Sequence, residues 1–179
     1  MIILASASPR RKEILETAGF DFEVEPVHVE EKVTPGLSPE QTAMDLARQK
    51  ALALAKSKPQ ATIIGADTIV VLEGEILGKP HDRADARRML RALSGKVHSV
   101  ITGVCLIKNS MEKCFFEETK VEFYKLSSQE IEAYVDTDEP MDKAGAYGIQ
   151  GRGCLLVKRI DGDYFNVVGL PVAALAREL

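Results

Sequence analysis

The chain has 179 residues, of which 45% are hydrophobic and 28% are charged, and this composition is typical of one folded globular domain rather than a disordered protein. Its formal net charge of −4 at pH 7 argues against a protein that coats nucleic acid, because such proteins carry an excess of lysine and arginine. No apolar run is long enough to span a bilayer, and the apolar start is too short for a signal peptide. We therefore expect a cytoplasmic protein with no stable nucleic-acid partner and no membrane association.

The three cysteines, Cys105, Cys114 and Cys154, form no C-x-x-C pair. Neither a disulfide framework nor a zinc cluster is indicated, which fits a reducing compartment. The three histidines stand far apart in the sequence, so we expect ordinary side chains rather than metal ligands.

The first half of the chain alternates apolar runs with amphipathic segments. Ser8 with Pro9 is typical of a helix start and Gly19 of a helix end, while Ser38 with Gln41 forms a capping box for a second helix. In chain order we expect a strand at 2–5, a helix at 9–18, a half-exposed strand at 20–27 followed by a loop, a helix at 38–58, a buried strand at 61–72 with a short return strand, and a helix at 82–95.

The second half is richer in hairpin signals. We expect a long hairpin with strands at 97–107 and 114–126, a helix at 127–137, a glycine-rich loop at 138–153, a second hairpin at 154–168 and a short helix after Pro171. The second hairpin would turn at Asp161-Gly162. Early alternation followed by hairpins favours an α/β fold of the mixed type, with helices packed around a mixed sheet, over an all-parallel doubly wound fold.

The segment "SASPRR" places two cations at the start of the first helix. Arg10 and Arg11 fall in the first turn, where the positive end of the helix dipole normally favours acidic residues. An anion held by backbone N–H groups, the Ser6 and Ser8 hydroxyls and the two guanidinium groups would compensate this charge, and phosphate is the usual such anion. The alternative is that both arginines are solvated, at a cost of roughly a few tenths of a kcal/mol.

Asp67 stands in "TIIGADTIVVL", a run that otherwise has the pattern of a fully buried strand. An ionised carboxylate in a core is costly unless it is paired, hydrogen-bonded or bound to a metal. Two interpretations stay open: a functional carboxylate, or a carboxylate at the end of the strand that caps a turn or pairs with an arginine.

Other charged residues are ambiguous. Glu30 and Glu31 lie in the loop after the second strand, where adjacent acids are most often a solvated pair. If this loop approaches Asp67, Glu31 and Asp67 are the candidate ligands of a hard divalent cation such as Mg²⁺. Lys50 and Lys79 belong to a common surface residue type, although Lys79 follows the strand pair that carries Asp67.

The loop "DKAGAYGIQGRG" contains four glycines but matches neither G-x-G-x-x-G nor a P-loop. Its glycines would serve close approach to a ligand or tight turns. The amide of Gln150 can donate to and accept from a base edge, or it can stabilise the loop. Together these features indicate a phosphate-bearing ligand, a carboxylate-held metal and hydrolysis or transfer at phosphorus.

The motifs "SASPRR", "GADTIVVLEGE", "GKP", "LSGKVHSVITGV", "EPMDKAGAYGIQG" and "NVVGLP", in this order, resemble those of the Maf family of nucleoside triphosphate pyrophosphatases. The resemblance covers essentially the whole chain. It implies one two-lobed domain over residues 1–179, with an elongated mixed sheet flanked by helices and a central cleft, as in inosine triphosphate pyrophosphatases. It also implies a divalent cation, Mg²⁺ or Mn²⁺, and hydrolysis of a nucleoside triphosphate to the monophosphate and pyrophosphate.

The arginine pair, "GADT" and "GIQG" resemble the family branch that acts on dTTP and UTP, rather than the branch that acts on 7-methyl-GTP. By motif, Asp67 would be the proton acceptor, and Arg10, Thr68 and Gln150 would matter for choosing the base. The full set of implied substrate-binding residues is Ser6, Ser8, Arg10, Arg11, Lys50, Thr68, Lys79, Lys143 and Gln150.

Two residues depart from the family pattern: Gln49 stands where a glutamate is common, and Gly78 where a larger residue occurs. They bear on rate and metal preference rather than on the reaction. A competing function is a nucleotide-binding regulatory module that inhibits septum formation without turnover, but a buried general base favours the enzyme. The resemblance is also compatible with a homodimer.

Overall fold

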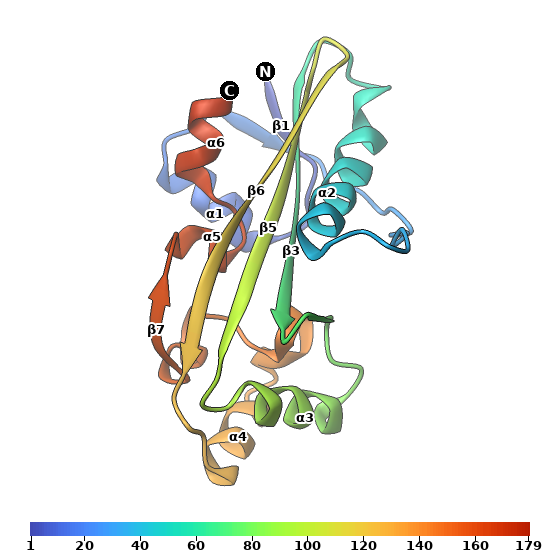
Figure 1. Ribbon diagram of the computed structural model, residues 1–179. Helices are drawn as coiled ribbons and strands as arrows, with labels where there is room; N and C mark the ends of the chain where they lie inside the picture. The colour runs from blue at the N-terminus through green and yellow to red at the C-terminus, as the bar shows by residue number, and fades with distance from the viewer. The chain divides into compact units, whose positions relative to one another are not determined.

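The computed structural model describes residues 1–179 and contains a seven-stranded mixed sheet (Figure 1). Its strands are β1 (Ile2–Leu4), β2 (Phe22–Val24), β3 (Thr62–Leu72), β4 (Glu75–Leu77), β5 (Val97–Lys108), β6 (Met111–Phe123) and β7 (Val157–Asp161). They lie in the order β2-β1-β3-β5-β6-β7, with β4 paired to β3. β1 is parallel to β2 and β3, whereas the β3–β4 and β6–β7 pairs are antiparallel. The predicted mixed α/β class is confirmed.

The helices begin where the capping signals predict. Complete capping boxes are formed by Ser38 with Gln41 and by Ser127 with Glu130. The Asp82 carboxylate accepts a hydrogen bond from the backbone N–H of Asp85, the third residue of its helix. None of the helices combines the length and apolar character needed to cross a membrane. The α-helices are α1 (Pro9–Thr17), α2 (Pro39–Ala55), α3 (Arg83–Leu93), α4 (Ser128–Val135), α5 (Tyr164–Val168) and α6 (Val172–Glu178), and the 3₁₀ helices are η1 (Glu139–Asp142), η2 (Ala144–Ala146) and η3 (Gly151–Leu155).

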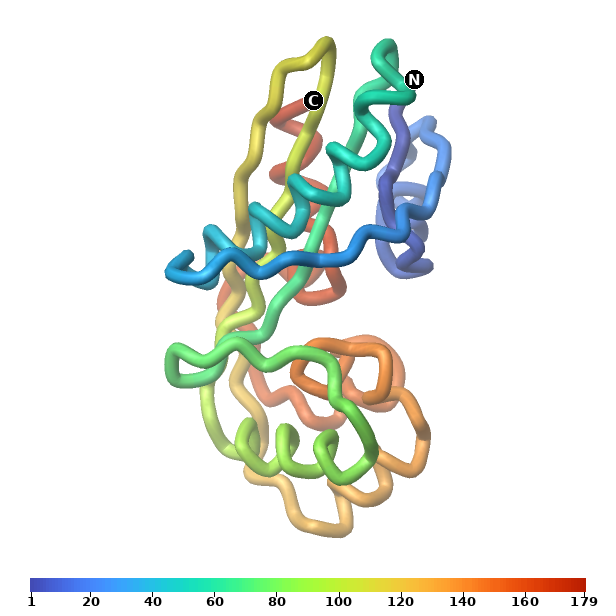
Figure 2. Tube along the Cα trace, turned by 90° about the vertical axis from the view of Figure 1, so that its right-hand side faces the viewer, coloured from blue at the N-terminus to red at the C-terminus, as the bar shows by residue number.

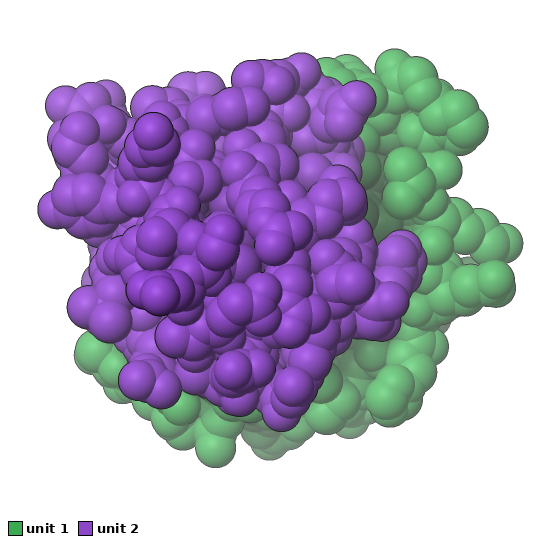
Figure 3. All heavy atoms as spheres, turned by 90° about the horizontal axis from the view of Figure 1, so that it is seen from below, with its two compact units in different colours: residues 1–68, 102–117, 169–179 green, residues 69–101, 118–168 purple.

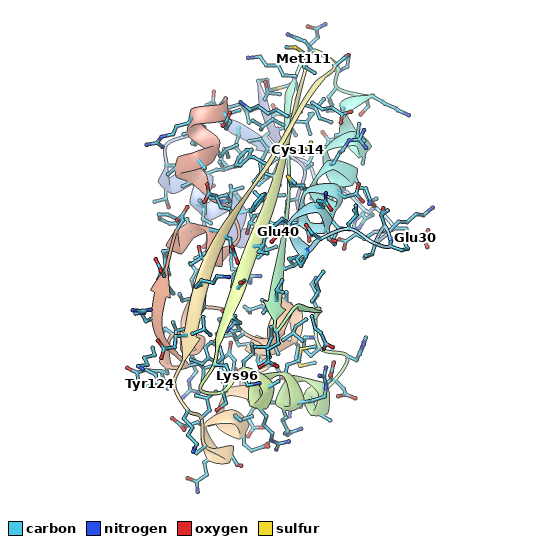
Figure 4. All side chains as sticks on the ribbon, viewed as in Figure 1. Glu30, Glu40, Lys96, Met111, Cys114 and Tyr124 are labelled. Atoms are coloured by element: carbon cyan, nitrogen blue, oxygen red, sulfur yellow. The ribbon has the colours of Figure 1, made fainter.

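The first predicted hairpin is present, but its turn is shorter than expected: β5 ends at Lys108 rather than 107, and β6 runs from Met111 to Phe123 rather than over 114–126. Only Asn109 and Ser110 separate β5 from β6, and their φ angles of 49° and 63° are typical of a two-residue type I′ turn. The polar segment 108–113 therefore belongs largely to the strands. Met111, labelled in Figure 4, lies at the tip of this hairpin.

Two predicted strands are wrong in extent or kind. β2 covers only three of the residues expected at 20–27, because it pairs with β1, which is itself only three residues long and ends opposite Val24. The second hairpin at 154–168 does not form: β7 pairs with β6, and the segment after Gly162 becomes α5. The Asp163 carboxylate accepts the Phe165 N–H at 2.7 Å, an interaction that favours a helix start over a returning strand.

The chain divides into two compact units, coloured separately in Figure 3. Unit 1 comprises residues 1–68, 102–117 and 169–179, and unit 2 comprises residues 69–101 and 118–168. Each unit has its own buried apolar cluster, centred on residues such as Ile3, Ala47 and Ile63 in unit 1 and on Leu90 and Phe123 in unit 2. Strands β3, β5 and β6 contribute residues to both units.

Candidate active site

A lysine joins two carboxylates in unit 1. Lys50 on α2 donates from Nζ to Oδ1 of Asp67 on β3, and its Nζ lies 2.9 Å from Oε1 of Glu31. The side chains of Lys50 and Asp67 are 15% and 13% exposed, and that of Glu31 is 47% exposed. Asp67 is thus paired, as a largely buried carboxylate must be. Its partner is a lysine, not the arginine or turn considered from the sequence.

Glycines allow α2 to lie close enough to the sheet for this contact. A Cβ at Gly65 of β3 would lie 2.2 Å from the Ala47 carbonyl oxygen, and a Cβ at Gly103 of β5 would lie 2.3 Å from the Ala43 carbonyl oxygen. Any side chain at either position would collide with the helix backbone. Lys50 lies about one turn beyond Ala47, and Asp67 is two residues beyond Gly65 and so on the same strand face. The close packing therefore sets the distance between lysine and carboxylate.

The loop that carries Glu31 is fastened to α2 by the Gln49 amide. The Lys32 N–H donates to Gln49 Oε1 at 3.1 Å, and Gln49 Nε2 donates back to the Lys32 carbonyl at 2.8 Å and to Asp45 Oδ2 at 2.9 Å. Figure 2 follows this loop into α2. A glutamate at position 49 has no donor for the Lys32 carbonyl, so the departure from the family pattern has a local structural role. Glu30 projects outward from the loop (Figure 4).

Arg11 is nearly buried, with 9% of its surface exposed. Its Nε donates to the Gly169 carbonyl at 2.8 Å, Nη2 to Thr68 Oγ1 at 3.1 Å and Nη1 to Ser6 Oγ at 3.3 Å. Burial lowers the pKa of the Arg11 guanidinium, and the negative charge of Asp67 opposes this lowering. Three of its five N–H donors are thus used within the protein, so Arg11 is not the solvated cation of the alternative interpretation.

Hydroxyl groups extend this network toward α1. Ser6 Oγ also accepts the Ser8 N–H at 3.2 Å, and Thr68 Oγ1 lies 2.9 Å from Thr102 Oγ1. Ser8 occupies the N-cap position of α1 as predicted, but its hydroxyl makes no capping hydrogen bond and the first turn has no acidic residue. The partly exposed Arg10 lies in this first turn. The start of α1 therefore has neither a side-chain cap nor an acidic residue in its first turn, as the sequence indicates.

The remaining predicted residues belong to unit 2. Lys79 is exposed in the turn after β4, and the preceding Gly78 carbonyl accepts the Gly145 N–H at 3.0 Å, which ties this turn to the glycine-rich loop. Lys143 Nζ donates to the Glu139 carbonyl at 2.6 Å and to an Asp142 carboxylate oxygen at 2.8 Å. Gln150 is also exposed. The roles of Lys79, Lys143 and Gln150 stay predictions.

Asp67 and Glu31 suit a hard cation in donor type and in number. Both carboxylates converge on one position, that of Lys50 Nζ, and Mg²⁺ commonly takes one or two carboxylates together with water and substrate phosphates. The chain contains no group of three or more His, Cys, Asp or Glu side chains that could hold a metal.

His98 lies in the core of unit 2, where burial lowers its pKa to about 4.

A family model described as "Maf-like protein" matches residues 1–179. The chain belongs to the Maf family. It is 50% identical over 178 residues to the dTTP/UTP pyrophosphatase of Bacillus pumilus (strain SAFR-032), covering 99% of this chain and 94% of that protein. The dTTP/UTP pyrophosphatase of Bacillus velezensis (strain DSM 23117 / BGSC 10A6 / LMG 26770 / FZB42) is 52% identical over 178 residues, with the same shares covered. The family resemblance seen in the sequence is confirmed.

Among solved structures, the chain is similar to the Staphylococcus aureus Ham1 protein, with a TM-score of 0.51 and 19% identity over 69% of this chain and 72% of that one. At this identity the similarity concerns the fold alone. It agrees with the mixed sheet described above and with the fold class expected from the sequence.

Sequence reasoning missed several residues that build the site. Gly65 and Gly103 did carry a signal, since an isolated glycine inside a buried strand often marks a close backbone approach. The only sequence signal at Gln49 is its departure from the family pattern. Nothing in the sequence indicated that Thr102 supports Thr68, because a threonine in a strand is common.

Proposed function

We propose that this protein hydrolyses dTTP and UTP to the nucleoside monophosphate and pyrophosphate. One observation carries the proposal: Asp67 is held by Lys50 beside Glu31, in a Maf-family chain whose relatives at about half identity are named dTTP/UTP pyrophosphatases. A fixed, largely buried carboxylate is suited to accept a proton, whereas nucleotide binding alone does not need one.

In the proposed mechanism, Asp67 accepts a proton from the water that attacks the α phosphorus. Lys50 contacts Oδ1, so Oδ2 is the oxygen that takes the proton. The water oxygen forms a bond to the α phosphorus as the bond between that phosphorus and the bridging oxygen to the β phosphate breaks. Pyrophosphate leaves with the bridging oxygen, and the nucleoside monophosphate remains.

Substrate binding is assigned to the residues that the family resemblance implies. Arg10, Ser8 and the backbone N–H groups at the start of α1 would receive phosphate oxygens, since this helix start has no side-chain cap. Ser6 and Arg11 would act chiefly by holding Thr68 in place. Thr68 and Gln150, with Arg10, would choose the base, and Lys79, Lys143 and Lys50 would balance the charge of the triphosphate.

Glu31 and Asp67 would hold the divalent cation, Mg²⁺ or Mn²⁺. When bound, such a cation neutralises charge on the phosphoryl oxygens and orients them for displacement. Because Lys50 Nζ pairs with both carboxylates, its ammonium group would compete with such a cation for them. A cytoplasmic location, expected from the cysteine usage, and a homodimer, expected from the family resemblance, complete the proposal.

The proposal is tested by Asp67→Asn. This variant keeps the size and shape of the side chain but removes the proton acceptor, so turnover of dTTP falls about a hundredfold or more. Nucleotide binding, measured by calorimetry, and the unfolding midpoint stay close to those of the wild type. Asp21→Asn, at an exposed aspartate of the same unit, serves as the matched control. Near-normal turnover by Asp67→Asn would contradict the role.

A further inference from the structure

The segment that carries Gln150 is held from both sides by two side chains of unit 2. Before Gln150, the Gly148 N–H donates to the hydroxyl oxygen of Tyr134 on α4 at 3.1 Å. After it, the backbone N–H groups of residues 152–153 donate to Oε2 and Oε1 of Glu139 on η1, each at 3.1 Å. Gln150 thus lies between two fixed points of its own backbone.

The two supporting side chains are also joined to each other. The Tyr134 hydroxyl donates to Glu139 Oε1 at 3.1 Å. Tyr134 is only 4% exposed, and burial raises the pKa of its hydroxyl, so the proton needed for this donation is retained. None of these hydrogen bonds uses the Gln150 amide, which stays exposed and available to a ligand.

Glycines let the loop close tightly around this pair. A Cβ at residue 153 would lie 1.9 Å from the Gly148 carbonyl oxygen, and a Cβ at Gly151, where φ is 61°, would lie 2.8 Å from Glu139 Oε2. A larger residue at either position would require the backbone to shift. The glycines of "GIQGRG" therefore allow the tight turns that place Glu139 and Tyr134 against the backbone on either side of Gln150.

We infer that Tyr134 and Glu139 are positioning residues for base selection, which fix the backbone over residues 148–153 so that the Gln150 amide meets the pyrimidine edge at one place. The inference rests on the proposed function, in which Gln150 helps to choose the base. Uracil and thymine present an N–H donor beside carbonyl acceptors, and an amide can complement both kinds of group. Such pairing discriminates between bases only when the amide is held in place, because a mobile side chain adapts to either.

The test compares kcat/KM for UTP and CTP in Tyr134→Phe and Glu139→Gln. Each substitution preserves size but removes a hydrogen bond of the support, so the preference for UTP over CTP falls about tenfold or more. Tyr124→Phe is the matched control, since Tyr124 is a tyrosine of the same unit with 52% of its surface exposed. We expect this variant to keep the wild-type preference for UTP over CTP. Thermal unfolding checks that each variant is folded. If Tyr134→Phe does not fold, the UTP/CTP preference of Glu139→Gln alone tests the inference.

A double-mutant cycle separates positioning from general stability. In a Gln150→Ala background, Tyr134→Phe changes the UTP/CTP preference no further, because both substitutions act through the same amide. An unchanged preference in both single variants, or a loss that persists in full without Gln150, overturns the inference. If the wild type itself releases no pyrophosphate from UTP, the proposed function fails and the inference with it. A selective wild type with unaffected variants overturns only the positioning role.

Discussion

At the scale of single residues, the neighbouring arginines of "SASPRR" differ in environment. Arg11 is buried and donates to Gly169, Ser6 and Thr68, whereas Arg10 is partly exposed in the first turn of α1. The same residue type therefore occupies two environments: one guanidinium organises the protein, and the other lies in the first helical turn, where we propose that it binds phosphate.

We predict that Arg11→Met lowers the free energy of unfolding by about 3 kcal/mol, because three buried or half-buried acceptors lose their donor. Arg10→Met lowers it by at most about 1 kcal/mol, since the residue lies near the surface. It raises the KM for dTTP instead. Urea unfolding and steady-state kinetics measure the two effects, and Lys12→Met on the same helix is the control. Equal destabilisation by both arginine variants would refute this division.

Residue identity was easiest to interpret where a charge interrupts an apolar pattern. Asp67 stands out in the sequence for this reason, and the structure places it against Lys50 and Glu31. The burial of Arg11 was not accessible to sequence reasoning, because it depends on the Gly169 carbonyl, 158 residues away along the chain.

At the scale of elements, the approach of α2 to β3 and β5 determines the site. Gly65 and Gly103 leave no room for a side chain beneath the helix, and Lys50 reaches Asp67 from the same helix. Local stability and the contact between Lys50 and Asp67 are therefore coupled through one helix–sheet interface.

Gly65→Ala tests this coupling. The added methyl group collides with the Ala47 carbonyl oxygen, which forces α2 away from the strand. We expect a loss of about 2 kcal/mol in the free energy of unfolding and a lower kcat in the variant that still folds at 25 °C. Gly78→Ala is the control for stability, because a Cβ there meets no atom within 4 Å. Wild-type stability and kcat for Gly65→Ala would show that the packing tolerates a larger residue.

Elements with a strong local signal were predicted well, and ambiguous turns were not. The capping boxes at Ser38 and Ser127 fix their helix starts. The Asp161-Gly162 turn is compatible with either a returning strand or a helix, and the interaction of Asp163 with the Phe165 N–H decides for the helix. The pairing of β7 with β6 depends on residues distant in sequence, so the local pattern at 154–168 cannot predict it.

At the scale of the whole molecule, the predicted site residues are distributed over both units. Unit 1 holds the lysine–carboxylate cluster and the Arg11 network, and unit 2 holds Lys79, Lys143 and the supported Gln150. Periodicity and turn signals predicted the mixed fold, and single charged and polar residues indicated a phosphate-bearing ligand, but neither selected a nucleotide. The proposed substrate class rests on the family resemblance carried by the order of motifs along the entire chain, because each motif alone is too short to be specific.

The most direct test of the proposed function is pyrophosphate release by the wild type from dTTP, UTP, CTP, 5-methyl-UTP, GTP and 7-methyl-GTP. Each nucleotide is assayed with Mg²⁺, with Mn²⁺ and with a chelator. We predict release that depends on the metal and is confined to the uracil and thymine nucleotides. Release mainly from 7-methyl-GTP would contradict the substrate assignment. Nucleotide binding without any release would contradict the enzyme itself and favour a regulatory binding module.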